Sequence, residues 1–217
     1  MQPKDLSLHH IIKAPQGITE KCPVLIMFHG YGSNEDDLFS FASELPEELF
    51  IISARAPHDL MPYGHAWYAI HFDAVDGKWS DNEQAIASRD LIATFIDEVI
   101  ENYPVKKDHV TLLGFSQGTI LSYAVALTYP KKVKNVVALS GYVNEDILGS
   151  TDNNYEHLAF YCSHGSVDQV IPVAWARRTP DFMKRLNINY VYEEFPVGHG
   201  VAPQNFYSFK KWLEERL

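Results

Sequence analysis

The chain has 217 residues, of which 46% are hydrophobic and 21% are charged. This length suffices for one globular domain with a substantial core and is short for two, so we expect a single domain over residues 1–217. The formal net charge is −10, and no run of Lys and Arg is longer than a pair, which disfavours binding to nucleic acid or to an anionic membrane surface. No apolar run reaches the length of a membrane span, so we expect no stable membrane insertion.

The two cysteines, Cys22 and Cys162, lie next to or within predicted strands, where a thiol behaves as a small buried apolar group. They belong to no metal-like cluster, and they favour a reducing compartment. The sequence leaves open whether a disulfide joins them, and nothing in it supports one. The first residues lack the apolar core of a signal peptide, so we expect a cytoplasmic protein.

The beginning of the chain predicts three strands and a helix. Residues 6–12 alternate well enough for an edge strand. Residues 23–28 form a continuous apolar run, which is typical of a parallel strand buried on both faces. Asn34 is suited to cap a helix over 34–44, because acidic residues follow it in the first turn. Residues 49–54 predict the next strand.

The pattern breaks at residues 55–80, which hold two prolines, two glycines and many aromatic residues without helical spacing. A long irregular segment inside a compact domain is usually functional. Residues 82–103 then carry apolar side chains at helical spacing, and they predict an amphipathic helix that Pro104 ends.

Strands and helices alternate through the rest of the chain. The expected elements are a strand over 109–113, a helix over 119–127, a strand over 133–139, a polar surface excursion over 144–156, a strand over 158–162, a helix over 173–186, a strand over 188–195 and a helix over 203–217. This alternation predicts an α/β fold with a mostly parallel central sheet. In such sheets, sites form in the loops that follow the C-terminal ends of the strands.

One of these strand ends carries Gly114-Phe115-Ser116-Gln117-Gly118, the pattern of a nucleophile elbow between a strand and a helix. The turn is sharp, so we expect a strained backbone at Ser116 and glycines where a Cβ would clash. The serine hydroxyl then projects above the sheet beside a helix N-terminus, which favours developing negative charge. A serine between glycines is also found in ordinary turns, so the assignment depends on its partners.

Asp168 and His199 are the expected partners, because each follows a predicted strand end and the order Ser, Asp, His is the α/β-hydrolase order. A neutral imidazole must take the serine proton, and a carboxylate must orient that imidazole. His164 also ends a strand, where a structural role is the alternative. Other candidates lie at the wrong edge, near the N-terminus, or in predicted loops and helix starts: His9, His10, His109, Asp146, Asp152 and Asp181.

An oxyanion hole needs two N–H donors directed at one point. The Gln117 N–H, directly after the nucleophile, is expected to be one donor. The loop His29-Gly30-Tyr31-Gly32 follows a buried strand, and the Tyr31 N–H is the expected second donor. The alternative for this loop is an ordinary glycine turn that leads into a helix.

The sequence holds no motif for a metal site or a nucleotide-binding site. There is no H-E-x-x-H, no C-x-x-C and no cluster of aspartates, so we expect no metal. Neither a P-loop nor a G-x-G-x-x-G phosphate cradle is present, so no nucleotide cofactor is expected.

The chain resembles the phospholipase/carboxylesterase family of α/β-hydrolases, which includes acyl-protein thioesterases. The matching stretches are His29-Gly30-Tyr31-Gly32, Gly114-Phe115-Ser116-Gln117-Gly118, His164-Gly165-Ser166-Val167-Asp168 with Val170-Ile171-Pro172, and Gly198-His199-Gly200. The resemblance implies the α/β-hydrolase fold, with helices on both faces of the sheet, and an esterase without cofactor that uses Ser116, Asp168 and His199. It also supports Tyr31 and Gln117 as oxyanion donors. Two stretches depart from the family pattern. The family often has Asp after the second glycine of the first motif, where this chain has Ser33-Asn34, and another glycine often follows the elbow, where this chain has Thr119.

These observations predict a serine hydrolase that acts on small-molecule carboxylic esters or thioesters through an acyl-enzyme. A serine peptidase or amidase on the same fold is one alternative, because fold and triad do not set the substrate. A ligand-binding protein with a vestigial site is another. The sequence leaves a homo-oligomer possible.

The expected acyl size follows from the connections. No large cap domain is predicted, because residues 144–156 are too few and too polar to roof a deep lipid tunnel. The aromatic residues within 55–80 are then candidates to wall a shallow cleft, with Trp67 and Tyr68 as substrate contacts. The alternative is that both cover the sheet edge as core. A shallow cleft favours short to medium acyl chains or compact aromatic esters, because each methylene left outside forfeits about 0.8 kcal/mol.

Overall fold

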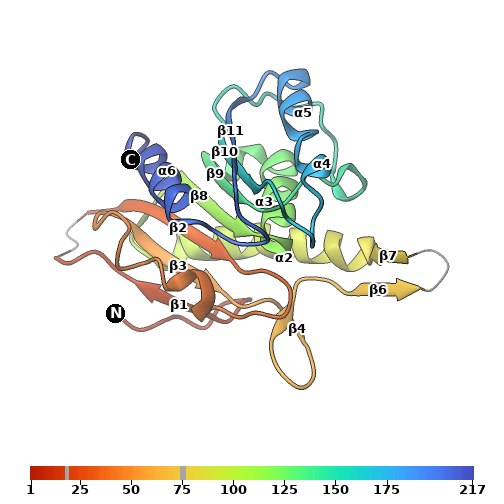
Figure 1. The fold of residues 1–217 in the computed structure, drawn as a ribbon. Coiled ribbons are helices and arrows are strands. Elements are labelled where there is room, and N and C mark those ends of the chain that lie inside the picture. Colours follow the sequence, from red (N-terminus) through yellow and green to blue (C-terminus); the bar gives the residue numbers. More distant parts are fainter. Residues whose placement is uncertain (18–19, 74–76) are drawn as a thin grey trace.

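The computed structural model describes residues 1–17, 20–73 and 77–217 (Figure 1). Over these residues the main sheet has seven strands in the order β1-β3-β2-β8-β9-β10-β11. All neighbours pair in parallel except β1, which pairs antiparallel with β3 at one edge. The strands are β1 (His10–Lys13), β2 (Cys22–Phe28), β3 (Phe50–Ala54), β8 (Val105–Phe115), β9 (Asn135–Leu139), β10 (Ala159–Gly165) and β11 (Asn189–Phe195).

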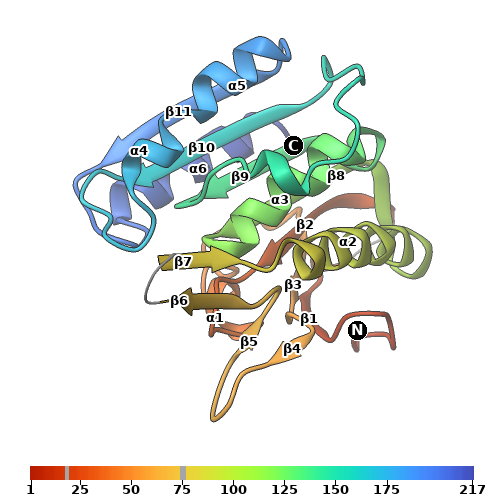
Figure 2. The ribbon, with the colours of Figure 1, turned by 90° about the vertical axis from the view of Figure 1, so that its right-hand side faces the viewer.

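Helices cover both faces of this sheet (Figures 1 and 2). On one face, α2 and α3 pack against side chains that include Val24 and Ile26 of β2. On the other face, α6 and the segment around α1 pack against Leu25 and Met27. Successive β2 side chains therefore enter opposite cores, which is why this strand is apolar without alternation. The helices are α1 (Asp36–Phe39), α2 (Asn82–Asn102), α3 (Gln117–Thr128), α4 (Val173–Ala176), α5 (Thr179–Arg185) and α6 (Pro203–Glu214), with short 3₁₀ turns η1 (Pro130–Lys132) and η2 (Glu145–Ile147).

Most expected elements are confirmed with shifted ends. The N-terminal edge strand begins at His10 rather than at residue 6. The strand before the elbow is longer than predicted, and it starts at Val105 directly after the helix α2. Both cysteines are free thiols, with Cys162 buried in β10.

Two helix predictions are wrong in extent. The helix expected over 34–44 is confined to the four residues of α1. The chain then continues in turns, in one of which the Phe41 N–H donates to the Leu38 carbonyl. The helix expected over 173–186 is divided into α4 and α5. Pro180 lies in the first turn of α5, where its missing N–H suits a helix start and not a helix interior.

The segment over 55–80 is not irregular throughout. It contains two antiparallel pairs, β4 (His58–Asp59) with β5 (His65–Ala66), and β6 (Ile70–Asp73) with β7 (Gly77–Ser80). These strands have two to four residues, so they leave no readable alternation in the sequence. An isolated bridge between Ser33 and His65 fastens the first pair to the loop after β2.

The connection between β9 and β10 carries only the single turn η2, so the described residues hold no large cap domain. The loops that follow β2, β8, β9, β10 and β11 meet at one edge of the sheet, where parallel strands end together. No helix within the described parts of the chain is long and apolar enough to cross a membrane.

Candidate active site

Ser116 occupies the turn between β8 and α3 with a strained backbone, as expected. Its φ of 54° and ψ of −114° lie outside the regions that most residues adopt. The flanking glycines are required by close backbone approach. A Cβ at Gly114 would lie 2.5 Å from the backbone of Gly118, and a Cβ at Gly118 would lie 2.0 Å from the carbonyl oxygen of Phe28. The elbow therefore packs directly on the end of β2.

Thr119 adds side-chain hydrogen bonds to the same turn. Its hydroxyl oxygen lies 2.6 Å from the carbonyl oxygens of both Gly114 and Leu139, and it accepts a hydrogen bond from the Leu139 N–H at 3.0 Å. The Ser116 N–H also donates to the Leu139 carbonyl at 3.0 Å. The elbow is thus fixed to the end of the neighbouring strand β9 by the Thr119 hydroxyl and the Ser116 amide.

The three residues expected to act together do meet. His199 Nε2 lies 2.9 Å from Ser116 Oγ, and His199 Nδ1 lies 2.7 Å from Asp168 Oδ2. Ser116 and Asp168 are 8% and 7% exposed, and the half-buried His199 ring packs on Phe115 with centroids 5.0 Å apart. The chain of contacts runs from a shielded carboxylate through an imidazole to a hydroxyl that still borders the cleft.

Asp168 is held on both oxygens. Oδ1 accepts from the backbone N–H groups of Val170 and Ile171, at 2.8 and 3.0 Å. Oδ2 accepts from His199 and lies 3.2 Å from Nε2 of the buried His164, which itself donates to the Ile171 carbonyl at 2.9 Å. Burial alone would raise the pKa of Asp168, but the hydrogen bonds from His199 and the two amides outweigh it, so the pKa lies below its ordinary value.

The two segments expected to supply oxyanion donors lie beside Ser116. Gln117 is the first residue of α3, and its side chain accepts from the Trp67 N–H and donates to the Tyr68 carbonyl, both at 2.8 Å. The loop with Tyr31 touches the nucleophile, because a Cβ at Gly30 would lie 3.3 Å from the Ser116 Cβ. Over the described residues, neither the Tyr31 N–H nor the Gln117 N–H has an acceptor.

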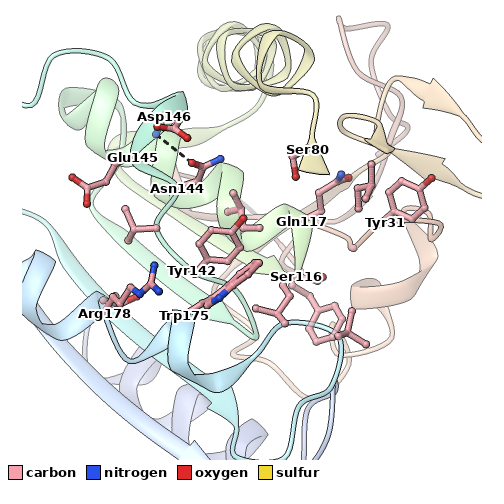
Figure 3. A pocket seen from close by; sticks show the side chains of 18 of the residues that line it. Tyr31, Ser80, Ser116, Gln117, Tyr142, Asn144, Glu145, Asp146, Trp175 and Arg178 are labelled. Atoms are coloured by element: carbon pink, nitrogen blue, oxygen red, sulfur yellow. Dashed lines mark hydrogen bonds between the residues drawn. The ribbon is translucent and has the colours of Figure 1, made fainter. Parts of the chain in front are cut away.

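A cleft of about 1020 Å³ opens at this edge of the sheet (Figure 3). Ser116 and His199 lie in its wall together with aromatic side chains from several loops. Tyr142 follows β9, Trp175 lies in α4, and their rings meet edge to face with centroids 5.0 Å apart. The aromatic lining residues are Tyr31, Tyr68, Phe115, Tyr142, Trp175 and Phe182.

Charged and polar residues line the end of the cleft that lies beyond Tyr142 and Trp175 as seen from Ser116 (Figure 3). Arg185 pairs with Glu145 at 2.9 Å, and Arg177 pairs through two bonds with Glu194. The labelled polar residues at this end are Asn144, Glu145, Asp146 and Arg178, with Arg185 beside Glu145, and the cleft is also lined by Arg177 and Asp181. The excursion over 144–156 therefore contributes to the site through its first residues.

The expectation for Trp67 needs correction. Its side chain is 0% exposed and packs on Phe28 and His29, with ring centroids 5.4 and 5.6 Å apart, so it is core and not cleft wall. Its indole N–H donates to the His29 carbonyl at 2.9 Å. Tyr68 does border the cleft, although only 2% of it is exposed. The two residues lie in a bend between β5 and β6, and only the second of them reaches the cleft.

Sequence reasoning missed Tyr142 and Trp175. Tyr142 stands three residues after the end of β9, and Trp175 stands seven residues after Asp168, so the rule that parallel strands end at the site would have found them. Within the described residues, no group of three or more His, Cys, Asp or Glu side chains is arranged to hold a metal ion.

Residues 9–217 match the sequence profile of the Phospholipase/Carboxylesterase family. The chain belongs to this family. Acyl-protein thioesterase 1 of Cryptococcus neoformans is 26% identical over 240 residues, which cover 97% of this chain and 98% of that protein. A probable carboxylesterase of Oryza sativa is 24% identical over 157 residues, with 70% of this chain and 58% of the relative covered.

Solved structures show the same fold. The Bacillus cereus carboxylesterase superposes with a TM-score of 0.82 at 19% identity, covering 97% of this chain and 95% of the other. Zea mays acyl-protein thioesterase 2 superposes with a TM-score of 0.76 at 20% identity, covering 96% and 98%. The resemblance read from the four motifs and the expected α/β-hydrolase fold are thereby confirmed, and the chain is a member of an esterase and thioesterase family.

Proposed function

We propose that this phospholipase/carboxylesterase family member is a serine hydrolase that cleaves carboxylic esters or thioesters through an acyl-enzyme. The observation that carries the proposal is the continuous chain of contacts from Asp168 Oδ2 through His199 to Ser116 Oγ. Because the carboxylate oxygen can only accept, His199 carries its proton on Nδ1. The Nε2 lone pair then faces the serine hydroxyl and can take its proton.

Acylation proceeds in two bond changes. Ser116 Oγ bonds to the substrate carbonyl carbon while its proton passes to His199 Nε2. The carbon–oxygen or carbon–sulfur bond then breaks, and the imidazolium returns the proton to the leaving alcohol or thiol. In deacylation, water attacks the acyl carbon while its proton passes to the same nitrogen. The bond between that carbon and Ser116 Oγ then breaks, Nε2 returns the proton to Oγ, and the acid is released. Asp168 stays ionised throughout and stabilises the imidazolium.

The N–H groups of Tyr31 and Gln117 are the groups that we assign to stabilise the negative charge on the carbonyl oxygen. Their positions beside Ser116 and the lack of any acceptor for them among the described residues support this role. The N-terminus of α3 adds a favourable dipole at the same point. Each donor of this kind is typically worth about 10²- to 10³-fold in kcat.

Short to medium acyl chains or compact aromatic esters are the proposed substrates. The cleft is apolar around Tyr142 and Trp175, where an acyl chain gains transfer energy. Beyond these rings it is lined by charged groups, and burying them against a longer chain would cost their hydration. Catalytic efficiency should therefore stop rising once the chain passes the aromatic pair.

A fluorophosphonate tests the proposal directly. It should label Ser116 in the native enzyme, and Ser116→Ala should abolish both labelling and turnover of a panel of esters and thioesters. Matched ester and amide substrates assayed side by side separate the esterase from a peptidase or amidase. Full esterase activity in Ser116→Ala would disprove the assignment.

A further inference from the structure

His29 is the first residue of the loop that holds Tyr31, and its side chain is bonded at both ring nitrogens although it does not line the cleft at Ser116. The residue is 0% exposed. The Ala56 N–H donates to Nε2 at 3.1 Å, and Nδ1 lies 2.7 Å from the Gly30 carbonyl oxygen. A buried histidine that is saturated by backbone groups has a fixed orientation.

The two contacts also fix where the proton of His29 lies. The Ala56 N–H can only donate, so Nε2 is an acceptor, and the ring proton is on Nδ1, from which it donates to the Gly30 carbonyl. Burial, as the largest influence, lowers the pKa of His29, which keeps the ring neutral and its Nε2 lone pair available.

The Gly30 carbonyl belongs to the peptide whose other end is the Tyr31 N–H. In a trans peptide the C=O and N–H bonds lie in one plane and point in opposite directions. Holding the carbonyl oxygen on the His29 side therefore directs the Tyr31 N–H to the opposite side, away from the core. Without such a hold, Gly30 offers little resistance to rotation of this peptide, because glycine tolerates many backbone conformations.

Other groups fasten the neighbouring peptides of the loop, and His29 is the closer of two donors to the Gly30 carbonyl. Trp67 donates its indole N–H to the His29 carbonyl at 2.9 Å, one peptide earlier. The Gly32 N–H donates to the His65 carbonyl at 2.9 Å, one peptide later. The Ser33 N–H also reaches the Gly30 carbonyl, but at 3.3 Å it is the longer of the two bonds to that oxygen.

We propose that His29 is a positioning residue of the oxyanion hole, which holds the Gly30–Tyr31 peptide so that the Tyr31 N–H faces the reacting carbonyl. The role rests on the serine-hydrolase function proposed above. A hydrogen bond to the carbonyl also polarises the peptide, and it makes the N–H at the other end a stronger donor. His29 thus acts on the transition state without touching the substrate.

Two variants with amide side chains each remove one of the two hydrogen bonds made by the His29 ring. In His29→Asn, the side-chain NH₂ takes the place of Nδ1–H and can still donate to the Gly30 carbonyl, while the Ala56 N–H loses its acceptor. In His29→Gln, the longer side chain reaches the place of Nε2 and can still accept from the Ala56 N–H, while the Gly30 carbonyl loses its closer donor. Each variant gives up one buried hydrogen bond, so their unfolding midpoints should be similar.

We expect His29→Asn to retain kcat within a few-fold and His29→Gln to lose about 10²- to 10³-fold, the effect of removing one oxyanion donor. KM should stay nearly unchanged in both, because the donor acts on the transition state and not on the bound ester. Equal losses in the two variants, retained kcat in both, or a larger loss in His29→Asn would each overturn the proposal.

Two further measurements keep the result clear. Fluorophosphonate labelling of Ser116 in the native enzyme tests the proposed function by itself: an unlabelled Ser116 refutes that function, whereas a labelled Ser116 with a fully active His29→Gln refutes only the role of His29. If both variants fail to fold, ¹⁵N NMR of the native protein decides. A proton on His29 Nδ1, with a downfield shift of the Tyr31 amide proton in the phosphonylated enzyme, supports the proposal. A proton on Nε2 or an unmoved Tyr31 amide contradicts it.

Discussion

His164 Nε2 lies 3.2 Å from Asp168 Oδ2, the same oxygen that accepts the hydrogen bond from His199. Both side chains of this inner contact are 0% exposed. Its nearer acceptor is the Ile171 carbonyl, at 2.9 Å. His164 therefore closes the side of Asp168 that faces away from the cleft, and it ties the loop carrying the carboxylate to the end of β10.

Replacing His164 should affect stability more than chemistry. His164→Ala leaves the buried Ile171 carbonyl without its side-chain donor, so we expect a loss of about 1–3 kcal/mol in the free energy of unfolding. Asp168 keeps its two backbone donors on Oδ1, so kcat should fall by about tenfold or less, far from the roughly 10⁴-fold effect of neutralising such a carboxylate. Urea unfolding and steady-state kinetics measure both quantities.

His157 offers the matched control for this variant. Its Nε2 also bonds a single backbone carbonyl, that of Pro130 at 2.7 Å, but the residue is exposed and does not line the cleft. His157→Ala should cost less stability and leave kcat unchanged. A kcat for His164→Ala as low as that of Asp168→Asn would show that His164 does more than hold the loop.

Trp175 should set the response to acyl length. Trp175 is 39% exposed, lines the cleft and meets Tyr142 edge to face, so Trp175→Ala removes apolar surface that only a medium acyl chain reaches. We expect kcat/KM for hexanoyl or octanoyl esters to fall by about 5- to 30-fold, while the acetyl ester changes little. Tyr207→Ala, on an exposed residue of α6 outside the cleft, is the control. A uniform loss across chain lengths would argue against an acyl contact.

Acid should weaken the fold through Glu35. Arg55 donates to both carboxylate oxygens of this nearly buried residue and lowers its pKa from 4.5 to about 2. Folding thus favours the ionised form, so this contribution is complete above pH 4.5 and is lost as the pH falls toward 2. A shift of this size corresponds to roughly 3 kcal/mol.

The substitution Glu35→Gln tests this dependence. The variant should be less stable than the native protein at pH 7, and the gap in unfolding free energy should narrow steadily between pH 4.5 and pH 2. Denaturant unfolding at several pH values provides the measurement. A difference in unfolding free energy that stays constant with pH would show that Glu35 stabilises the fold through its packing and not through its charge.

The three residues that meet at the candidate site could be predicted from the sequence because their chemistry and their location are both encoded locally. Ser116 stands between glycines that a tight turn requires, and Asp168 and His199 each follow an apolar strand. Parallel strands bring such ends together whatever the helices do. The same reasoning would have reached Tyr142, which also follows a strand end.

Other features depend on tertiary packing that a sequence does not display. Trp67 and Tyr68 are adjacent aromatic residues, and only the path of the chain decides that the first enters the core against Phe28. The break between α4 and α5 had a local sign in Pro180, but the short length of α1 did not. Glu35, which directly precedes α1, pairs with Arg55, and these two residues are distant in sequence.

The close fit behind the elbow constrains the order in which substitutions can accumulate during evolution. A Cβ at Gly141 would lie 2.4 Å from the Thr119 methyl carbon, so no larger residue fits at position 141 while threonine stands at 119. A lineage with glycine at 119 has more room at 141, and alanine there would block the later arrival of threonine. The path to the present elbow therefore requires glycine at 141 before threonine at 119, and we expect the two positions to change together in related sequences.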